Sequence, residues 1–219
     1  MKVLLGVTGS IAAKLTPKMV KAFQDDGNEV NVVLSEAAKY FVDSSSYDCP
    51  TWRDHDEFPI KYERVNDDGS MMIPHIYLKD WADVLVVAPL TANTLAKIAH
   101  GMADNLLTST IRAWKVDNPI VVAPAMNTDM WNHPVTNRNL QEIMHTYNYD
   151  VAGKSMFGND LGSMQKTYDR CHYCLLPRKR LFVLVPPVSK KLACGAAGIG
   201  AMADINDIVN ITKRVVIGQ

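Results

Sequence analysis

Short apolar runs alternate along the chain with stretches in which apolar residues recur every three or four positions. The apolar runs predict buried strands at residues 3–7, 30–34, 82–88, 120–123 and 181–185. The periodic stretches predict helices at residues 11–24, 93–99, 105–114 and 135–144. Because strands and helices alternate, we expect a parallel sheet with helices on both faces, which is a doubly wound, Rossmann-like (flavodoxin-like) α/β fold.

Two stretches interrupt this alternation. Residues 43–74 are polar and rich in turn-forming residues, so we expect a loop with little regular structure. Residues 153–180 have no clear periodicity, and we interpret them as an irregular insertion. The length of the chain, residues 1–219, is typical of a single domain.

The composition excludes several classes of protein. Of the 219 residues, 47% are hydrophobic and 21% are charged, with 23 basic and 23 acidic side chains. These proportions are typical of a globular domain, and the lack of a basic excess argues against a nucleic-acid partner. No apolar run is long enough to span a membrane, and the first one ends at Thr8, which disfavours a signal peptide. We therefore expect a cytoplasmic location and reduced cysteines.

Residues suited to ligand binding follow the predicted strands, and in doubly wound folds ligands bind beyond the carboxyl ends of the strands. Gly9 and Ser10 follow the first strand, where they suit either a phosphate-binding turn or a simple capped turn. Asn93 and Asn127 follow two later strands, each after an Ala-Pro pair. Each asparagine suits a helix cap, but the pair favours one shared rim of a binding site. The lack of a G-x-G-x-x-G motif argues against a nicotinamide cofactor.

Histidine and cysteine residues supply further candidates. His75 suits proton transfer near neutral pH, although an isolated histidine is more often structural. Cys194 lies in a glycine-rich loop beside lysines, where it is either a reactive thiol or a small buried residue. Cys171 and Cys174 lack the second pair that a structural zinc site needs, so we predict no metal site.

Taken together, these motifs resemble those of the homo-oligomeric flavin-containing Cys decarboxylases. The similarity covers about residues 2–146 and 182–215. It is carried, in order, by Gly9-Ser10-Ile11-Ala12, His75-Ile76-Tyr77-Leu78, Pro89-Leu90-Thr91-Ala92-Asn93-Thr94, Pro124-Ala125-Met126-Asn127 and Leu192-Ala193-Cys194-Gly195. The resemblance implies FMN as cofactor, a small-molecule substrate and a homotrimer with its binding sites near subunit interfaces. From the charge balance and the short apolar runs, we expect no nucleic-acid and no membrane partner.

The resemblance also implies roles for individual residues. His75 would be the catalytic acid/base, and Cys194 would be the catalytic proton donor in a final reduction. The flavin would be bound by Ser10, Ile11, Ala12, Ser35, Glu36, Ala37, Phe41, Thr91, Ala92, Asn93, Thr94 and Ala125. The substrate would be bound by Asn127, Met130, Lys191, Ala193 and Met202.

The implied reaction is decarboxylation of 4′-phosphopantothenoylcysteine to 4′-phosphopantetheine in coenzyme A biosynthesis. Flavin oxidation of the thiol to a thioaldehyde lets the carbanion left by CO₂ loss become an ene-thiolate, which is then reduced again. Cys194 favours this branch over peptidyl-cysteine decarboxylases, which stop at the ene-thiol. A second alternative is a non-catalytic phosphatase-regulatory relative, but the long acidic extensions of such proteins have no counterpart in this sequence.

Two features depart from the family pattern. Ala196 stands where the family has an acidic residue, which bears on the reduction step rather than on flavin binding. Asn127 and Cys194 are 67 positions apart (194 − 127), more than the family uses, and the surplus coincides with residues 153–180. These residues are either a surface insertion, which costs little closure entropy, or a translated intron. Sequencing the mature transcript distinguishes the two.

Overall fold

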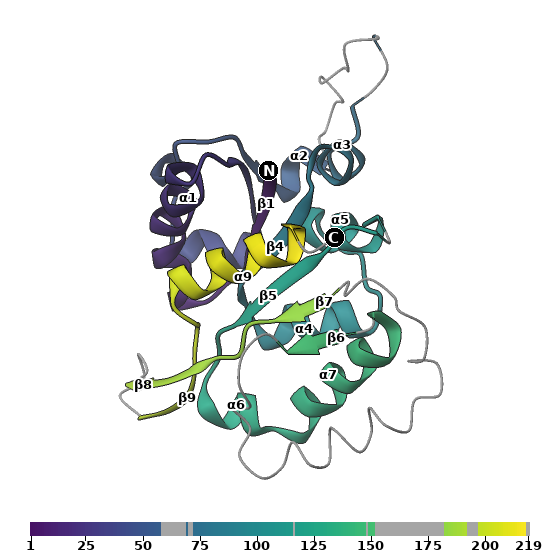
Figure 1. The fold of residues 1–219 in the computed structure, drawn as a ribbon. Coiled ribbons are helices and arrows are strands. Elements are labelled where there is room, and N and C mark those ends of the chain that lie inside the picture. Colours follow the sequence, from purple (N-terminus) through teal and green to yellow (C-terminus); the bar gives the residue numbers. More distant parts are fainter. Residues whose placement is uncertain are drawn as a thin grey trace.

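A parallel sheet forms the centre of the computed structural model, which describes residues 1–57, 69, 72–115, 117–147, 149–151, 182–191 and 197–217. Within these residues, seven strands pair in the order β3-β2-β1-β4-β5-β7-β6, and every neighbouring pair is parallel (Figure 1). The chain runs outward from β1 to one edge, returns to β4 beside β1, and then builds the other half of the sheet. Ligands bind at such a reversal of strand order in doubly wound folds.

The elements have the following bounds. The sheet strands are β1 (Lys2–Val7), β2 (Glu29–Leu34), β3 (Thr51–Arg53), β4 (Val84–Leu90), β5 (Ile120–Pro124), β6 (Tyr149–Val151) and β7 (Phe182–Leu184). The α-helices are α1 (Thr16–Asp25), α2 (Asp54–Glu57), α3 (Pro74–Trp81), α4 (Ala92–Ala99), α5 (Leu106–Arg112), α6 (Thr128–Asn132), α7 (Pro134–Tyr147) and α9 (Ile205–Ile217). Short 3-10 helices are η1 (Ile11–Leu15), η2 (Glu36–Tyr40) and η3 (Ser44–Ser46), and β8 (Val188–Lys191) pairs with β9 (Ala197–Ala201) in an antiparallel hairpin.

Helices cover both faces of the sheet, as the alternating pattern predicts. Val3 and Leu5 of β1 face one core cluster, which includes side chains of α1 and α9. Leu4 faces the opposite cluster, which includes side chains of α3, α4, α5 and α7. Successive side chains of a strand point to opposite faces, so a strand covered on both sides is apolar at every position. The predicted doubly wound α/β fold is confirmed.

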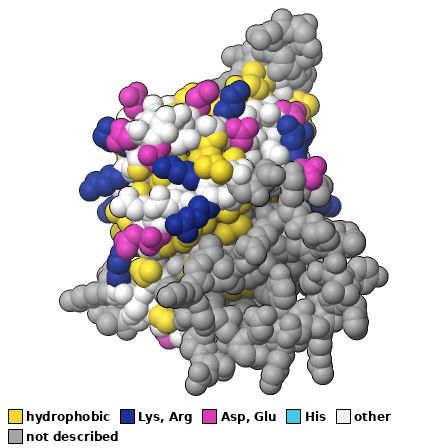
Figure 2. Space-filling view, in the orientation of Figure 1, with side chains coloured by type: hydrophobic (Ala, Val, Ile, Leu, Met, Phe, Trp, Pro, Cys, Tyr) yellow, Lys and Arg dark blue, Asp and Glu magenta, His cyan; other side chains and the backbone are white. Residues whose placement is uncertain are grey.

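Charged side chains of both signs are interspersed over the outer surface of α1 and α9 (Figure 2). Lys21 and Asp25 form an ion pair one turn apart on α1, and Lys213 of α9 pairs with Asp26 at the end of α1. This mixture agrees with the formal net charge of zero. Of the helices that the structure describes, none has both the length and the apolar character that crossing a membrane requires.

Residues 43–74 were predicted as a loop, and this prediction is wrong for the part that the structure describes. Thr51–Arg53 is an edge strand parallel to β2, and α2 follows it without a break. The strand has three residues, too few for an alternating pattern to be recognised. The tryptophan at position 52 was a usable sequence signal, because it is a large apolar residue in a polar stretch. In the structure Trp52 is buried, and its indole N–H donates to Asn31 Oδ1 at 3.0 Å. Residues 58–68 and 70–71 lie outside the described residues.

The other predicted elements differ from the observed ones mainly at their ends. The helix predicted over residues 11–24 is divided into η1 and α1, and the strand predicted over residues 82–88 spans Val84–Leu90. Helices α3, α6 and α9, strand β6 and the β8–β9 hairpin were not predicted. The insertion predicted at residues 153–180 lies outside the described residues, so it stays a prediction.

Candidate functional site

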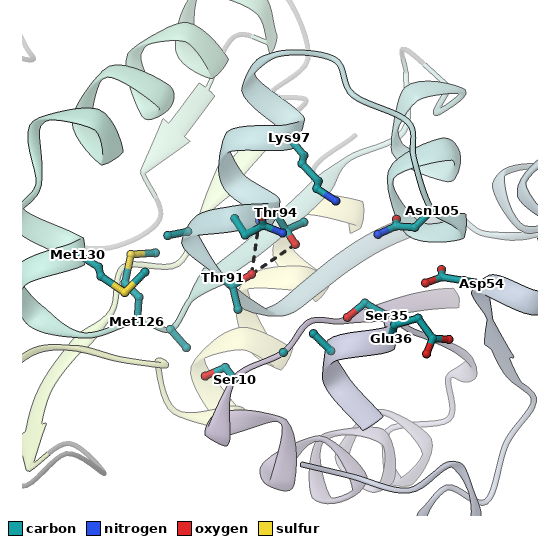
Figure 3. Close-up of a pocket in the computed structure, with 15 residues that line it drawn as sticks. Ser10, Ser35, Glu36, Asp54, Thr91, Thr94, Lys97, Asn105, Met126 and Met130 are labelled. Atoms are coloured by element: carbon teal, nitrogen blue, oxygen red, sulfur yellow. Dashed lines mark hydrogen bonds between the residues drawn. The ribbon is translucent and has the colours of Figure 1, made fainter. Parts of the chain in front are cut away.

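A cavity of about 490 Å³ lies at the carboxyl ends of β1, β2, β4 and β5 (Figure 3). It is lined by Gly9, Ser10, Ser35, Glu36, Ala37, Asp54, Thr91, Ala92, Asn93, Thr94, Lys97, Asn105, Ala125, Met126 and Met130. Doubly wound folds bind their ligands at this edge of the sheet. The volume is within the usual range of small-molecule and cofactor sites.

The turn after β1 passes very close to η2. A Cβ added to Gly9 would lie 2.4 Å from the Cβ of Ala37, closer than non-bonded carbons come, so this approach requires glycine. Ser10 then caps η1, because its Oγ accepts a hydrogen bond from the N–H of Ala12 at 3.3 Å. Ser10 also lines the cavity. The turn is therefore a capped turn located where a ligand can contact it.

Threonine hydroxyls join the ends of β1 and β4. Thr8 Oγ1 donates to the carbonyl of Pro89 at 2.6 Å and accepts from the N–H of Thr91 at 3.0 Å. Thr91 in turn caps α4, since its Oγ1 accepts from the N–H of Thr94 at 3.4 Å. Thr91 is therefore the cap of this helix, whereas Asn93, which the sequence offered as a cap, is an exposed residue of the cavity wall.

Asn127 has a different environment from Asn93. Its Oδ1 accepts from the N–H of Asp129 at 2.7 Å and caps α6. The two asparagines follow the neighbouring strands β4 and β5. Asn93 lines the cavity, and Asn127 is not among the described residues that line it. Met126 and Met130, on either side of Asn127, do line it. The predicted shared rim is therefore present as adjacent strand ends, and Asn127 itself serves as a helix cap.

The β8–β9 hairpin packs against the segment that contains Asn127. The N–H of Met126 donates to the carbonyl of Gly200 at 2.9 Å. Gly200 has a φ of +149°, and a Cβ there would lie 2.2 Å from the carbonyl oxygen of Met126, so the approach requires glycine. The predicted residues Ala193 and Cys194 belong to residues 192–196, which lie outside the described residues between these two strands.

Besides Asn127, four of the predicted binding residues are not among the described residues that line the cavity. Ile11 is exposed at the start of η1. Ala12, Phe41 and Met202 pack in or against the core cluster beneath α1 and α9, with Met202 only 4% exposed. Ile11 and Ala12 are outside the described cavity lining although they directly follow Ser10, which does line the cavity. Lys191 belongs to β8, and its side chain lies outside the described part of the structure.

His75 lies in the first turn of α3, beside a buried carboxylate. Its backbone N–H donates to Glu57 Oε2 at 3.1 Å, and its Nδ1 is 2.5 Å from Glu57 Oε1. The Glu57 side chain is 7% exposed and that of His75 is 25% exposed. His75 is not among the described residues that line the cavity. Helix α2 nevertheless connects the two places, because it begins at Asp54 on the cavity wall and ends at Glu57.

Three polar residues at one end of the cavity, Asp54, Lys97 and Asn105, were not predicted (Figure 3). Asp54 Oδ1 accepts from the N–H of Leu106 at 3.1 Å, and burial raises the pKa of the Asp54 carboxyl, against the lowering effect of that bond. Lys97 pairs with an acidic side chain in the next loop, and Asn105 caps α5. The capping-box spacing from Asn105 was a usable signal for that residue.

Of the four cysteines in the sequence, Cys49 lies within the described part of the structure. Cys49 is a half-buried free thiol. Burial raises the pKa of this thiol to about 11, which makes it a weak nucleophile at neutral pH. Cys171, Cys174 and Cys194 lie outside the described residues.

Comparison with known proteins identifies the family. The sequence model of the flavoprotein family matches residues 1–217. The chain is 39% identical to phosphopantothenoylcysteine decarboxylase of Mus musculus over 215 residues, which cover 98% of this chain and 86% of the mouse protein. It is 38% identical to the enzyme of the same name from Oryza sativa over 216 residues, covering 98% and 80% of the two chains. The chain belongs to this flavoprotein family.

Solved structures of this flavoprotein family share the fold. One is a mutant PPC decarboxylase complexed with pantothenoylaminoethenethiol; it is 36% identical, has a TM-score of 0.72, and the match covers 97% of this chain and 96% of the other. Another is the FMN binding protein AtHal3, with 36% identity, a TM-score of 0.70, and coverage of 100% and 97%. The resemblance inferred from the sequence motifs is confirmed.

Proposed function

We propose that this protein decarboxylates 4′-phosphopantothenoylcysteine to 4′-phosphopantetheine and that FMN binds in the cavity at the carboxyl ends of the strands. The observation that carries this proposal is the composition of the cavity wall. Of the twelve residues predicted to bind the flavin, nine line the cavity: Ser10, Ser35, Glu36, Ala37, Thr91, Ala92, Asn93, Thr94 and Ala125. They come from four separate segments of the chain.

The cavity wall suits a flavin nucleotide on its own chemistry. Ser35 Oγ is buried and, within the described residues, has no hydrogen-bond partner although Ser35 lines the cavity. A buried hydroxyl is normally hydrogen-bonded, so a polar group of a ligand is the natural partner for this one. The turn at Gly9 and the first turn of α4 belong to the same wall, and the start of a helix favours an anionic group such as a phosphate.

In the proposed reaction the protein binds, orients and transfers protons, and the cofactor provides the redox chemistry. When bound, FMN supplies the reversible oxidation of the substrate thiol that makes loss of CO₂ possible. His75 is the proposed acid/base, and Cys194 the proposed proton donor when the ene-thiol is reduced. The cysteine assignment is supported by the structural neighbour that holds pantothenoylaminoethenethiol, an ene-thiol compound, since that protein is a cysteine-to-serine mutant.

The proposal includes a homotrimer. His75 lies off the cavity wall of its own chain, and the apolar side chains of Ile73 and Ile76 beside it are 43% and 37% exposed. A second subunit packed on this surface would cover the two isoleucines. His75 would then lie near the cavity of that second subunit. Sedimentation of the purified protein tests the trimer, and a monomer that retains full activity would contradict it. The cytoplasmic location stays a prediction.

The experiment that tests the activity is mass spectrometry of the products formed from 4′-phosphopantothenoylcysteine by the purified flavin-loaded protein. We expect 4′-phosphopantetheine, which requires both CO₂ loss and reduction. A Cys194→Ser variant separates the two steps, because it should release CO₂ and accumulate the oxidised ene-thiol product. Unchanged substrate with flavin-loaded protein would refute the proposed substrate, and normal product from Cys194→Ser would remove Cys194 from the reaction.

A further inference from the structure

Glu57 is a buried carboxylate whose two oxygens both contact one residue. With 7% of its side chain exposed, it has lost most of its hydration, which costs free energy unless the oxygens are hydrogen-bonded. Oε2 accepts from the backbone N–H of His75 at 3.1 Å, and Oε1 lies 2.5 Å from Nδ1 of the same histidine. The carboxylate therefore holds His75 both at its backbone and at its ring.

This arrangement determines which ring nitrogen carries the proton. A carboxylate only accepts hydrogen bonds, so the contact with Glu57 requires the proton on Nδ1 of His75. In the neutral ring Nε2 then has the lone pair and is the atom able to accept a proton. Without a fixed acceptor at Nδ1, the two tautomers would compete and the ring would be free to rotate.

We propose that Glu57 is a positioning residue that holds His75 in the Nδ1–H tautomer and leaves Nε2 as its proton-transferring atom. The catalytic part of this inference rests on the proposed function, in which His75 is the acid/base. The tautomer is a property of the protein itself and is measurable without substrate. A carboxylate that orients a catalytic histidine in this way is a recurrent arrangement in enzymes of unrelated folds.

The surrounding elements hold Glu57 in place. Strand β3 pairs in parallel with β2, and α2 begins at the next residue, Asp54. The N–H of Arg53 donates to Asp56 Oδ2 at 2.8 Å, which closes the first turn of α2. Asp54 accepts from the N–H of Leu106 at the start of α5. Helix α2 is thus anchored to the sheet edge at one end and to α5 beside it, and Glu57 is presented to α3 from a fixed position.

Glu57→Gln is the informative variant, because the glutamine side chain has one acceptor oxygen. His75 needs two acceptors, one for its backbone N–H and one for Nδ1–H. If that oxygen accepts from the backbone N–H, the amide NH₂ faces Nδ1 and the ring proton moves to Nε2. If it accepts from Nδ1–H instead, the NH₂ opposes the backbone N–H. We expect the Nδ1–H tautomer to lose population and kcat to fall roughly 100-fold, with KM changed less than about threefold.

Two further variants serve as comparisons. Glu57→Asp keeps the charge and both acceptors on a shorter side chain, so it should retain the Nδ1–H tautomer and more activity than Glu57→Gln. Glu142→Gln makes the same chemical change on an exposed glutamate of α7 and should alter neither the tautomer nor kcat. Flavin absorbance and thermal melting of each variant report whether it folds.

The measurement is ¹⁵N NMR of histidine-labelled, flavin-loaded full-length protein, with the His75 signals assigned by their loss in His75→Asn, together with steady-state kinetics. A wild-type Nδ1–H tautomer that Glu57→Gln disturbs, along with the fall in kcat, supports the proposal. An Nε2–H tautomer in the wild type overturns it, even if Glu57→Gln does not fold. Unchanged kcat in a folded Glu57→Gln also overturns it. Inactive wild-type protein would instead refute the proposed function, and the tautomer would still decide the role of Glu57 in orienting the ring.

Discussion

The central strand β4 and the edge segment formed by β3 and α2 both contribute to the site, but they are encoded differently. All seven residues of Val84–Leu90 are buried, and the cavity wall follows directly after them. The seven residues of Thr51–Glu57 are mostly polar, yet this segment runs from Asp54 on the cavity wall to Glu57, which contacts His75. A strand covered on both faces has to be apolar, so its sequence reveals it. A short edge strand has no such requirement, and its structure depends on its neighbours.

In the proposed function the central region binds the cofactor and the edge region positions the residue that transfers protons, and His75→Asn tests this division most strongly. We expect CO₂ release to fall by roughly 10²–10⁴-fold, the usual contribution of a general acid or base. FMN should stay bound, because His75 is not among the described cavity-lining residues. Product analysis and flavin absorbance measure the two effects. Loss of both the flavin and the activity would contradict the separation of cofactor binding from proton transfer. Retained turnover would refute the role of His75.

Stability should also differ between the two regions. Leu85 of β4 is fully buried, so Leu85→Ala should lower the free energy of unfolding by about 2–5 kcal/mol. Thr51 of β3 is only half-buried at the sheet edge, and Thr51→Ala should lower it by less than about 1 kcal/mol. Denaturant unfolding of both variants measures the difference. Equal losses would mean that the edge strand contributes as much to the cooperative core as β4 does.

Gly9→Ala probes the cavity wall where β1 and η2 meet. The added Cβ would lie 2.4 Å from that of Ala37, so the two segments have to separate. Overpacking of this kind costs about 1–3 kcal/mol. We expect weaker FMN binding by flavin fluorescence titration, while His75 and Glu57 keep their contacts. Gly27→Ala is the matched control, because a Cβ there would meet nothing within 4 Å although the positive φ of Gly27 adds strain. Equal FMN affinity in both variants would contradict a role for the close turn.

The smallest expected effect concerns Asp54, where the edge segment meets the cavity. Burial raises the pKa of this carboxyl above its ordinary value of 3.8, so ionisation is less favourable in the folded than in the unfolded protein. The stability that the neutral carboxyl contributes is therefore fully present below pH 3.8 and is lost as the pH rises through the raised pKa. Asp54→Asn should raise Tm at neutral pH by no more than about 2–4 °C. The gain should shrink in acid, and a pH-independent difference in Tm would contradict this explanation.

The site residues that could be predicted share one property. Thr91–Thr94 and Ala125 follow long buried strands, so the apolar pattern locates the strand ends and the motifs there mark the ligand site. Asp54 and Lys97 were missed because each is a common surface residue type whose position on the wall depends on how helices pack. Ile11 and Phe41, which the family resemblance assigns to the flavin, are not among the described residues that line the cavity: Ile11 is exposed, and Phe41 packs against the core cluster beneath α1 and α9.

The sequence by itself determined the doubly wound sheet, the strand ends that carry the cavity, and the flavoprotein family. These depend on local properties, namely which residues are apolar and which motifs follow them. Only the tertiary structure decided that Asn127 caps a helix, that Met202 is buried in the core, and that Glu57 contacts His75 from 18 residues away. Those facts depend on hydrogen bonds and packing between segments that the chain brings together only when it folds, and a residue's type does not reveal its partner.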